Sequence, residues 1–140
     1  MGGTVKSFED LRAWQEGRKL VNTIYALTNS TAFRKDLALR DQIRRAAISI
    51  LLNIAEGFAR DTDKEFRHYL IQSRGSVAEM QSALYIALDQ QYMLQSKFEE
   101  MYRASESLGK MLTKLINYLS KASSYRKKES SLTTDQQTID

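Results

Sequence analysis

His68 is the only histidine of the chain, and it follows Glu65 by three residues. A Glu-x-x-His pair of this spacing is half of the ligand set of di-metal carboxylate bundles, which need a second such pair and two further Glu. The second histidine is absent, and so is cysteine. We therefore predict no metal site and no cofactor, and interpret Glu65 and His68 as neighbours on a solvated face.

Other catalytic patterns are missing as well. The sequence has no Walker loop and no dinucleotide fingerprint, and a single histidine cannot build a Ser-His-Asp set. We expect a non-enzymatic protein with no catalytic residues. A mechanism carried by carboxylates alone is the enzymatic alternative, but we assign Glu56 and Glu79 to Arg45 instead.

One polar row crosses an otherwise apolar segment, Ala46 to Ala59. Its members are spaced by four, four and three residues, which places them on one helical face: Arg45, Ser49, Asn53 and Glu56. A second row follows the same spacing further along the chain: Gln72, Gly75 with Ser76, and Glu79.

Because buried polar groups need partners, we expect these two rows to face each other. We predict an ion pair between Arg45 and Glu79 and a hydrogen bond between Asn53 and Ser76, with Gly75 letting the two backbones approach. We interpret the row as a structural device that fixes helix register, and a ligand site is the alternative.

Basic residues gather in the same half of the sequence. We assign a tentative nucleic-acid contact to eight of them: Arg34, Lys35, Arg40, Arg44, Arg60, Lys64, Arg67 and Arg74. The whole chain carries 21 Lys and Arg against 17 Asp and Glu, a net charge of +4, which permits a polyanionic partner without requiring one. A solvated, merely stabilising charge pattern is the other interpretation.

The elements that must position these residues are helices. The 140 residues contain no proline and only six glycines, so the usual signals for turns and strands are scarce. We predict one helix from Ser7 to about Asn29, a second over Asp36–Ala59, a third over Asp63–Asp89, and a fourth from about Gln95 to Ala122.

Two of these helices carry the three-four alternation of a bundle seam, and short connections favour antiparallel neighbours. The seam residues are Phe66, Leu70, Ser73, Val77, Met80, Leu84 and Ala87, then Phe98, Met101, Ser105, Leu108, Leu112, Leu115, Leu119 and Ala122. We predict an all-α, antiparallel up-down-up-down four-helix bundle over residues 8–122, after an extension at 1–7 and before a polar, disordered tail at 123–140.

The second helix is apolar on nearly every side between Ala46 and Ala59. Such a helix needs more to pack against than one bundle offers, so we predict a homo-oligomer formed through it. A tightly wrapped four-helix core that covers the excess is the alternative. With no cysteine and no apolar export segment in residues 1–7, we expect a cytoplasmic protein without a membrane partner or a small-molecule substrate.

Three segments resemble the four-helix bundle family named for intervening sequences in 23S ribosomal RNA genes: Phe8–Thr28, Leu39–Arg60 and Lys64–Leu84. The resemblance is most specific in the QIRRAA, NIAEG and GSVAE stretches, which hold Arg45, Asn53, Glu56, Gly57, Gly75, Ser76 and Glu79. It implies a left-handed up-down bundle and a five-fold ring with a central channel. It also implies kinship with accessory proteins of reverse transcriptases in diversity-generating retroelements, where a basic barrel contacts polymerase and RNA.

Together these observations predict a homo-oligomeric scaffold, pentameric by the resemblance, that binds nucleic acid or a nucleoprotein through a basic surface. A role as an accessory to a reverse transcriptase is implied by the resemblance alone. The rival prediction is a protein–protein interaction module in which the basic residues serve only solubility.

Overall fold

The computed structural model describes the backbone of residues 4–139 and the side chains of residues 4–122. Within that part the chain forms four α-helices, two short 3₁₀ helices and no strand. The elements are η1 (Phe8–Asp10), α1 (Arg12–Thr28), η2 (Phe33–Lys35), α2 (Leu37–Phe58), α3 (Asp63–Asp89) and α4 (Gln95–Ile139).

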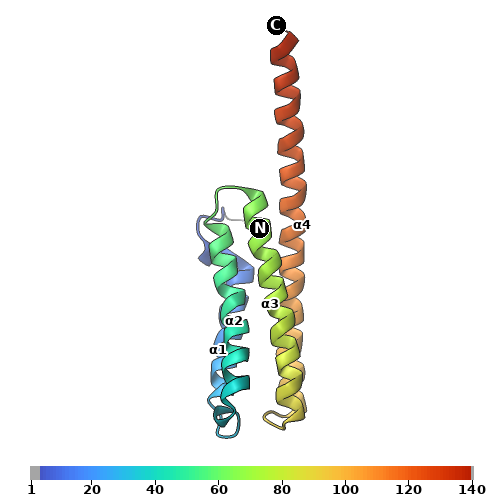
Figure 1. The fold of residues 1–140 in the computed structure, drawn as a ribbon. Helices are drawn as coiled ribbons and strands as arrows, with labels where there is room; N and C mark the ends of the chain where they lie inside the picture. The colour runs from blue at the N-terminus through green and yellow to red at the C-terminus, as the bar shows by residue number, and fades with distance from the viewer. Residues whose placement is uncertain (1–3, 140) are drawn as a thin grey trace.

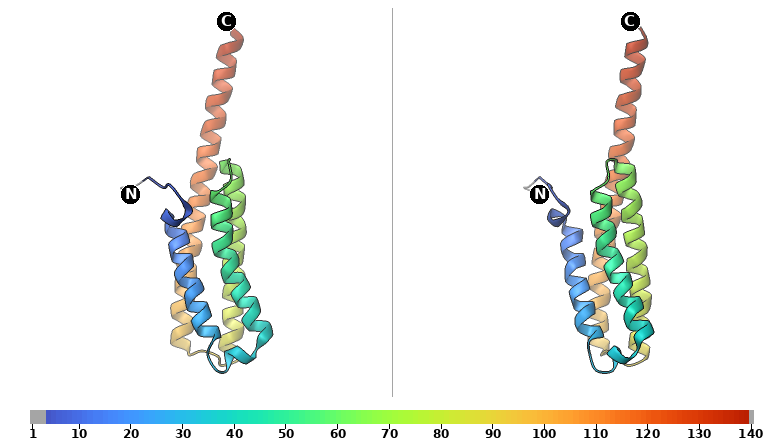
Figure 2. Two further views of the ribbon diagram at one scale, coloured as in Figure 1. Left: turned by 90° about the vertical axis from the view of Figure 1, so that its left-hand side faces the viewer. Right: turned by 60° about the vertical axis from the view of Figure 1, so that its left-hand side comes forward.

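The four helices lie side by side, and the chain changes direction at each connection (Figures 1 and 2). The most extensive contacts join α2 to α3 and α3 to α4, while α1 packs against α2 and more sparsely against α4. Each helix therefore buries one face against two neighbours, the arrangement that a single shared core requires.

The helix starts follow the signals in the sequence. Asp36 accepts a hydrogen bond from the Leu39 backbone at 3.1 Å, and Thr62 accepts one from Glu65 at 3.1 Å, so each side chain satisfies a backbone donor of the first turn. At the N-terminus the Asp10 carboxylate accepts from the Ser7 backbone at 3.2 Å. Ser7 therefore caps only the short helix η1. The backbone at Leu11 is extended, so α1 is a separate helix that begins at Arg12.

The core contains most of the predicted seam. On α3 the residues from Leu70 to Ala87 are buried as expected, while Phe66 at the start of the seam is half-buried. On α4 the buried residue near the end is Ile116 rather than Leu115, which is half-buried. An α-helix has 3.6 residues per turn, so a strict alternation of three- and four-residue steps slowly rotates away from the core. Two four-residue steps in succession, from Leu108 to Leu112 and from Leu112 to Ile116, keep the apolar stripe facing the core.

The predicted end of the fourth helix is wrong. We expected it at Ala122, but α4 continues as helix to Ile139 and extends beyond the other three helices (Figure 1). The sequence after Gly109 contains neither proline nor glycine, so no residue interrupts the helical hydrogen bonds. The side chains of the predicted tail, residues 123–140, lie outside the described part of the chain.

At the end of the bundle where η2 lies, Phe33 is completely buried and its ring centroid lies 5.0 Å from that of Tyr92. The Tyr92 hydroxyl donates a hydrogen bond to the Asp36 carboxylate at 2.9 Å, which ties the α3–α4 connection to the start of α2. Over the described residues, no helix has the combination of length and apolar character that crossing a membrane demands.

Candidate functional site on the outer face of α2

The boundary between α2 and α3 is closed by small hydroxyl side chains. Ser49 and Ser76 lie with their Oγ atoms 2.9 Å apart, and the buried Ser73 hydroxyl donates to the Ile50 carbonyl at 2.8 Å. Asn53 donates from Nδ2 to the Ser49 carbonyl at 2.9 Å and to Ser49 Oγ at 3.0 Å. The polar row therefore continues into a hydrogen-bonded network that spans the two helices.

The pairing predicted for this row is wrong in detail. Asn53 bonds to Ser49 on its own helix, and Ser49, not Asn53, contacts Ser76. Arg45 and Glu79 are both exposed, and no ion pair joins them among the described residues. The buried contact between α2 and α3 lies deeper in the bundle, at the hydrogen bond from Ser73 to Ile50. The polar row therefore lies along the rim of the boundary, and its charged members are exposed to solvent.

The glycine that permits close approach is Gly57, not Gly75. A Cβ atom on Gly57 would lie 2.7 Å from Cβ of Tyr69 and 3.2 Å from the Phe66 carbonyl oxygen, so no larger residue fits without displacement. A Cβ atom on Gly75 would meet nothing within 4 Å. The prediction that Gly75 brings the two backbones together is therefore wrong, because Gly75 is exposed on the outer side of α3.

The outer face of α2 is apolar at its centre. Leu52 is 62% exposed, and Ile48 one turn earlier is half-buried. These two side chains border a shallow hollow of about 350 Å³ whose other walls are polar. Those walls come from Arg45, Ser49, Asn53, Glu56 and Tyr69. Part of the apolar excess predicted for α2 is thus left uncovered by the bundle, and it lies beside the polar row.

The eight basic residues assigned to nucleic acid do not form one surface. Arg34, Lys35, Arg40 and Arg44 lie at the end of the bundle where α2 begins, and Arg60, Lys64 and Arg67 lie where it ends. Since a helix rises 1.5 Å per residue, Arg40 lies about 27 Å from the end of α2 at Phe58, which Arg60 follows. Arg74 lies near the middle of α3. The sequence prediction grouped residues that are close in number but far apart in space.

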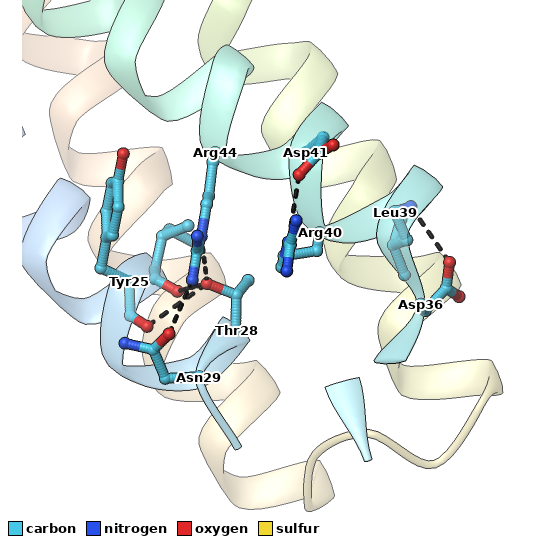
Figure 3. Close-up of polar contacts among 9 residues, drawn as sticks. Tyr25, Thr28, Asn29, Asp36, Leu39, Arg40, Asp41 and Arg44 are labelled. Atoms are coloured by element: carbon cyan, nitrogen blue, oxygen red, sulfur yellow. Dashed lines mark hydrogen bonds and ion pairs between the residues drawn. The ribbon is translucent and has the colours of Figure 1, made fainter. Parts of the chain in front are cut away.

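Several of these cations have internal partners. Arg44 donates to Thr28 Oγ1 and to Asn29 Oδ1, both at 2.8 Å, and lies over the ring of Tyr25 (Figure 3). It thereby holds the C-terminal end of α1, where a positive charge also favours the helix dipole. Arg40 pairs with Asp41 at 3.0 Å. The contacts of Arg44 join α2 to the end of α1 and give it a structural role, whereas the Arg40 pair joins adjacent residues of one helix.

Arg60 at the other end behaves in the same way. Its guanidinium pairs with Glu56 at 2.7 Å, hydrogen-bonds the Tyr69 hydroxyl and lies over the Tyr69 ring. Glu56, which we had assigned to Arg45, therefore pairs with Arg60 one turn later on the same helix. His68 contacts Gln72 at 3.1 Å, and the described residues contain no group of three or more His, Cys, Asp or Glu that could hold a metal ion.

One known protein family matches most of the chain. Residues 9–114 match the family described as 23S rRNA-intervening sequence protein. The chain belongs to this family. The match spans all of α1, α2 and α3 and most of the part of α4 that packs on them.

A solved structure shares the fold. It is a crystal structure of a protein with unknown function from the S23 ribosomal protein family of Bacteroides thetaiotaomicron. It superposes with a TM-score of 0.70 at 19% sequence identity, covering 75% of this chain and 95% of the other. No curated protein matches the chain.

In this member of the 23S rRNA-intervening sequence family, the residues that carry the resemblance divide into two groups. Gly57 and Ser76 are buried in the α2–α3 boundary, and Asn53 is half-buried beside them. Arg45, Glu56, Gly75 and Glu79 are exposed. The buried group explains how α2 and α3 pack against each other. The exposed group lies on the solvent-facing sides of the same two helices and takes no part in that packing.

A larger hollow of about 640 Å³ lies between α3 and α4, where the sequence predicts no site. Arg74 was assigned to a surface on helices two and three, but it points across to α4 and donates to Thr113 Oγ1 at 3.2 Å. Lys110 and Lys114 line the same hollow. Facing positions on two long helices carry no signal in a single sequence, because their alignment depends on the length of the α3–α4 connection.

Proposed function

We propose that this family member is a non-enzymatic, homo-oligomeric scaffold that assembles through the outer face of α2. The observation that supports the proposal is the exposed Leu52, which with Ile48 forms an apolar centre framed by polar groups. An apolar centre with a polar rim is the usual composition of a protein–protein interface.

The charged residues around this centre favour a second copy of the chain as the occupant. Arg45 and Glu79 have opposite charges, are both exposed, and are not joined by an ion pair within one described chain. A neighbouring copy would bring a Glu79 to an Arg45 and give both a partner. Repeated contacts between two different faces close into a ring when the rotation allows it, and the pentamer implied by the resemblance is one such ring.

Light scattering coupled to size exclusion tests the assembly. We expect a mass several times the 16.1 kDa of one chain, and we expect Leu52→Glu to lower it toward that of a single chain. The matched control is Leu94→Glu, which adds the same charge at a leucine that is 76% exposed in the α3–α4 connection. A wild-type protein that remains monomeric at micromolar concentration contradicts the proposal.

Binding of nucleic acid is the second function that we propose for this scaffold. It is supported by the net charge of +4 and by cations that have no acidic partner among the described side chains, Arg74, Lys110 and Lys114 among them. A role as accessory to a reverse transcriptase would follow from the resemblance, and co-purification of a polymerase is its test. Recovery of one stoichiometric protein after nuclease treatment would favour the interaction module instead.

A further inference from the structure

The hollow between α3 and α4 runs along both helices and changes character from one end to the other. Three contacts cross from α3 to α4 in order. Arg74 donates to Thr113 Oγ1, and Gln81 Nε2 donates to Ser105 Oγ at 2.9 Å. Further along, the rings of Tyr85 and Tyr102 lie with their centroids 5.6 Å apart. The lining residues of α3 run from Arg74 to Gln81, over about 10 Å, and those of α4 run from Tyr102 to Asn117, over about 22 Å. The hollow is therefore an elongated track with ordered contacts.

One end of this track is cationic. Arg74, Lys110 and Lys114 line it against a single carboxylate, Glu106, so three positive charges face one negative charge. None of the three cations forms an ion pair within the described residues, whereas Arg40, Arg60 and Arg103 do. An excess of unpaired positive charge in a recess attracts phosphate groups.

At the other end the ring of Tyr102 lines the hollow, and Tyr85 lies next to Tyr102 outside the lining. Tyr85 is 49% exposed, and its ring packs against those of Phe98 and Tyr102 with centroids 4.8 and 5.6 Å away. Burial, followed by the neighbouring Tyr85, raises the pKa of the Tyr102 phenol above its usual value, so this ring stays neutral near pH 7. A half-exposed ring that packs against two others is a suitable surface for stacking a base.

From this arrangement we infer that the α3–α4 track binds a short segment of single-stranded nucleic acid, with phosphates at Arg74, Lys110 and Lys114 and an unpaired base on Tyr85. The inference rests on the nucleic-acid half of the proposed function and names its site. Amide and hydroxyl groups of Gln81, Ser105, Thr113 and Asn117 line the track between and beside the two ends, where base edges and sugar hydroxyls need partners.

The geometry favours a single strand over a duplex or an acidic peptide. Adjacent helices pack with axes 8–10 Å apart, so the recess between them is narrower than a duplex, and stacking on Tyr85 requires a base that is free of its complement. A peptide helix docks through large apolar anchors in an apolar groove, but the apolar lining here is only Val77, Ala78 and Gly109 beside the Tyr102 ring.

Fluorescence anisotropy of a labelled single-stranded RNA of about 12 nucleotides, mixed in sequence, tests the site on the full chain. We expect the Lys110→Glu and Lys114→Glu double variant to weaken binding about tenfold or more at low salt. The slope of log affinity against log salt should fall by about 1.4, since each phosphate contact to a single strand contributes about 0.7.

The matched control is Lys6→Glu with Arg12→Glu, which changes the net charge equally at exposed positions before and at the start of α1. We expect this pair to alter the affinity less than twofold and to leave the salt slope unchanged. Tyr85→Leu keeps an apolar contact with Phe98 but removes the stacking surface, and we expect about a tenfold loss. The same RNA annealed to its complement should bind more weakly and should not respond to Tyr85→Leu.

Each other outcome overturns the inference. Equal weakening by both charge-reversed pairs would show diffuse attraction and leave nucleic-acid binding without this site. Loss of oligomer mass in the Lys110 and Lys114 variant would identify the track as a contact between copies, and tight binding of an acidic peptide but not RNA would make it a protein-docking site. No RNA binding by the wild type at low salt would remove both the site and the nucleic-acid function.

If charge reversal unfolds the chain, as judged by circular dichroism, Lys110→Gln with Lys114→Gln gives the same comparison.

Discussion

The two boundaries of α3 are built differently, although each joins it to a long helix. On the α2 side, a Cβ atom at Gly57 would lie 2.7 Å from Tyr69, and the Ser49–Ser76 and Ser73–Ile50 hydrogen bonds fill the space between the helices. On the α4 side, a Cβ atom at Gly109 would find its nearest neighbour, Val77, 4.0 Å away, and the outer side of this boundary is an open hollow.

The difference shows that a small residue at a helix boundary does not always bring the two helices close together. Glycine and serine let two backbones approach only where nothing else holds the helices apart. At Gly57 they close the boundary, whereas at Gly109 the longer side chains around it, Arg74 and Tyr102 among them, leave a recess. We therefore expect the α2–α3 boundary to tolerate substitution poorly and the α3–α4 boundary to tolerate it well.

The largest effect should come from Gly57→Ala. Its new methyl group would overlap the Tyr69 side chain and the Phe66 carbonyl, which are anchored to the backbone and cannot move independently. We expect the free energy of unfolding to fall by about 1 to 3 kcal/mol, despite the better helix propensity of alanine. Urea denaturation followed by circular dichroism measures it. An unchanged midpoint would show that the two helices separate easily and that the boundary is not tightly packed.

A second, smaller effect is expected at Ser73. Its buried hydroxyl donates to the Ile50 carbonyl across the boundary, so Ser73→Ala removes one interhelical hydrogen bond and little volume. We expect a loss of about 1 kcal/mol in the same denaturation experiment. The control is Ser82→Ala on the exposed side of α3, which should change stability by less than about 0.5 kcal/mol. Equal effects at both positions would assign the loss to propensity and not to the bond.

The helices themselves could be predicted from the sequence because their signals are local. The bounds of α3 match the prediction at Asp63 and Asp89, and the Thr62 side chain caps its first turn. These features depend on residues within one or two turns of each other. The end of α4 differs from the prediction because polar composition after Ala122 does not by itself end a helix, and the sequence there contains no proline or glycine.

The candidate sites were harder to predict because they depend on helix rotation. A polar row on α2 says which residues share a face, but a small rotation decides whether Arg45 points to α3 or to solvent. The same holds for Arg44 and Arg74, which look alike in sequence although one binds Thr28 and Asn29 and the other crosses to Thr113. The bond from Tyr92 to Asp36 joins residues too far apart in sequence for any local pattern to indicate it.

Gly109→Ala should have the opposite sign to Gly57→Ala. The added methyl group would meet only Val77 at 4.0 Å, an ordinary contact distance, so the gain in helix propensity is not offset by a clash. We expect the free energy of unfolding to rise by about 0.5 to 1 kcal/mol. Gly75→Ala, where the new atom meets nothing within 4 Å, is the companion variant and should gain as much. A loss at Gly109 alone would mean that the α3–α4 boundary is as close as the α2–α3 boundary.

The smallest effect is expected for the charges on the rim of the α2–α3 boundary. Within one described chain Arg45 and Glu79 are exposed and not paired with each other, so Arg45→Ala and Glu79→Ala should each change stability by less than about 0.5 kcal/mol in dilute protein. A double-mutant cycle, measured by denaturation at increasing protein concentration, separates the two places where these charges can meet. A coupling energy present at every concentration would mean that they pair within one chain, against the side-chain positions described above. Coupling that appears only as the protein assembles would mean that the predicted pair forms between copies, with α2 of one copy against α3 of the next.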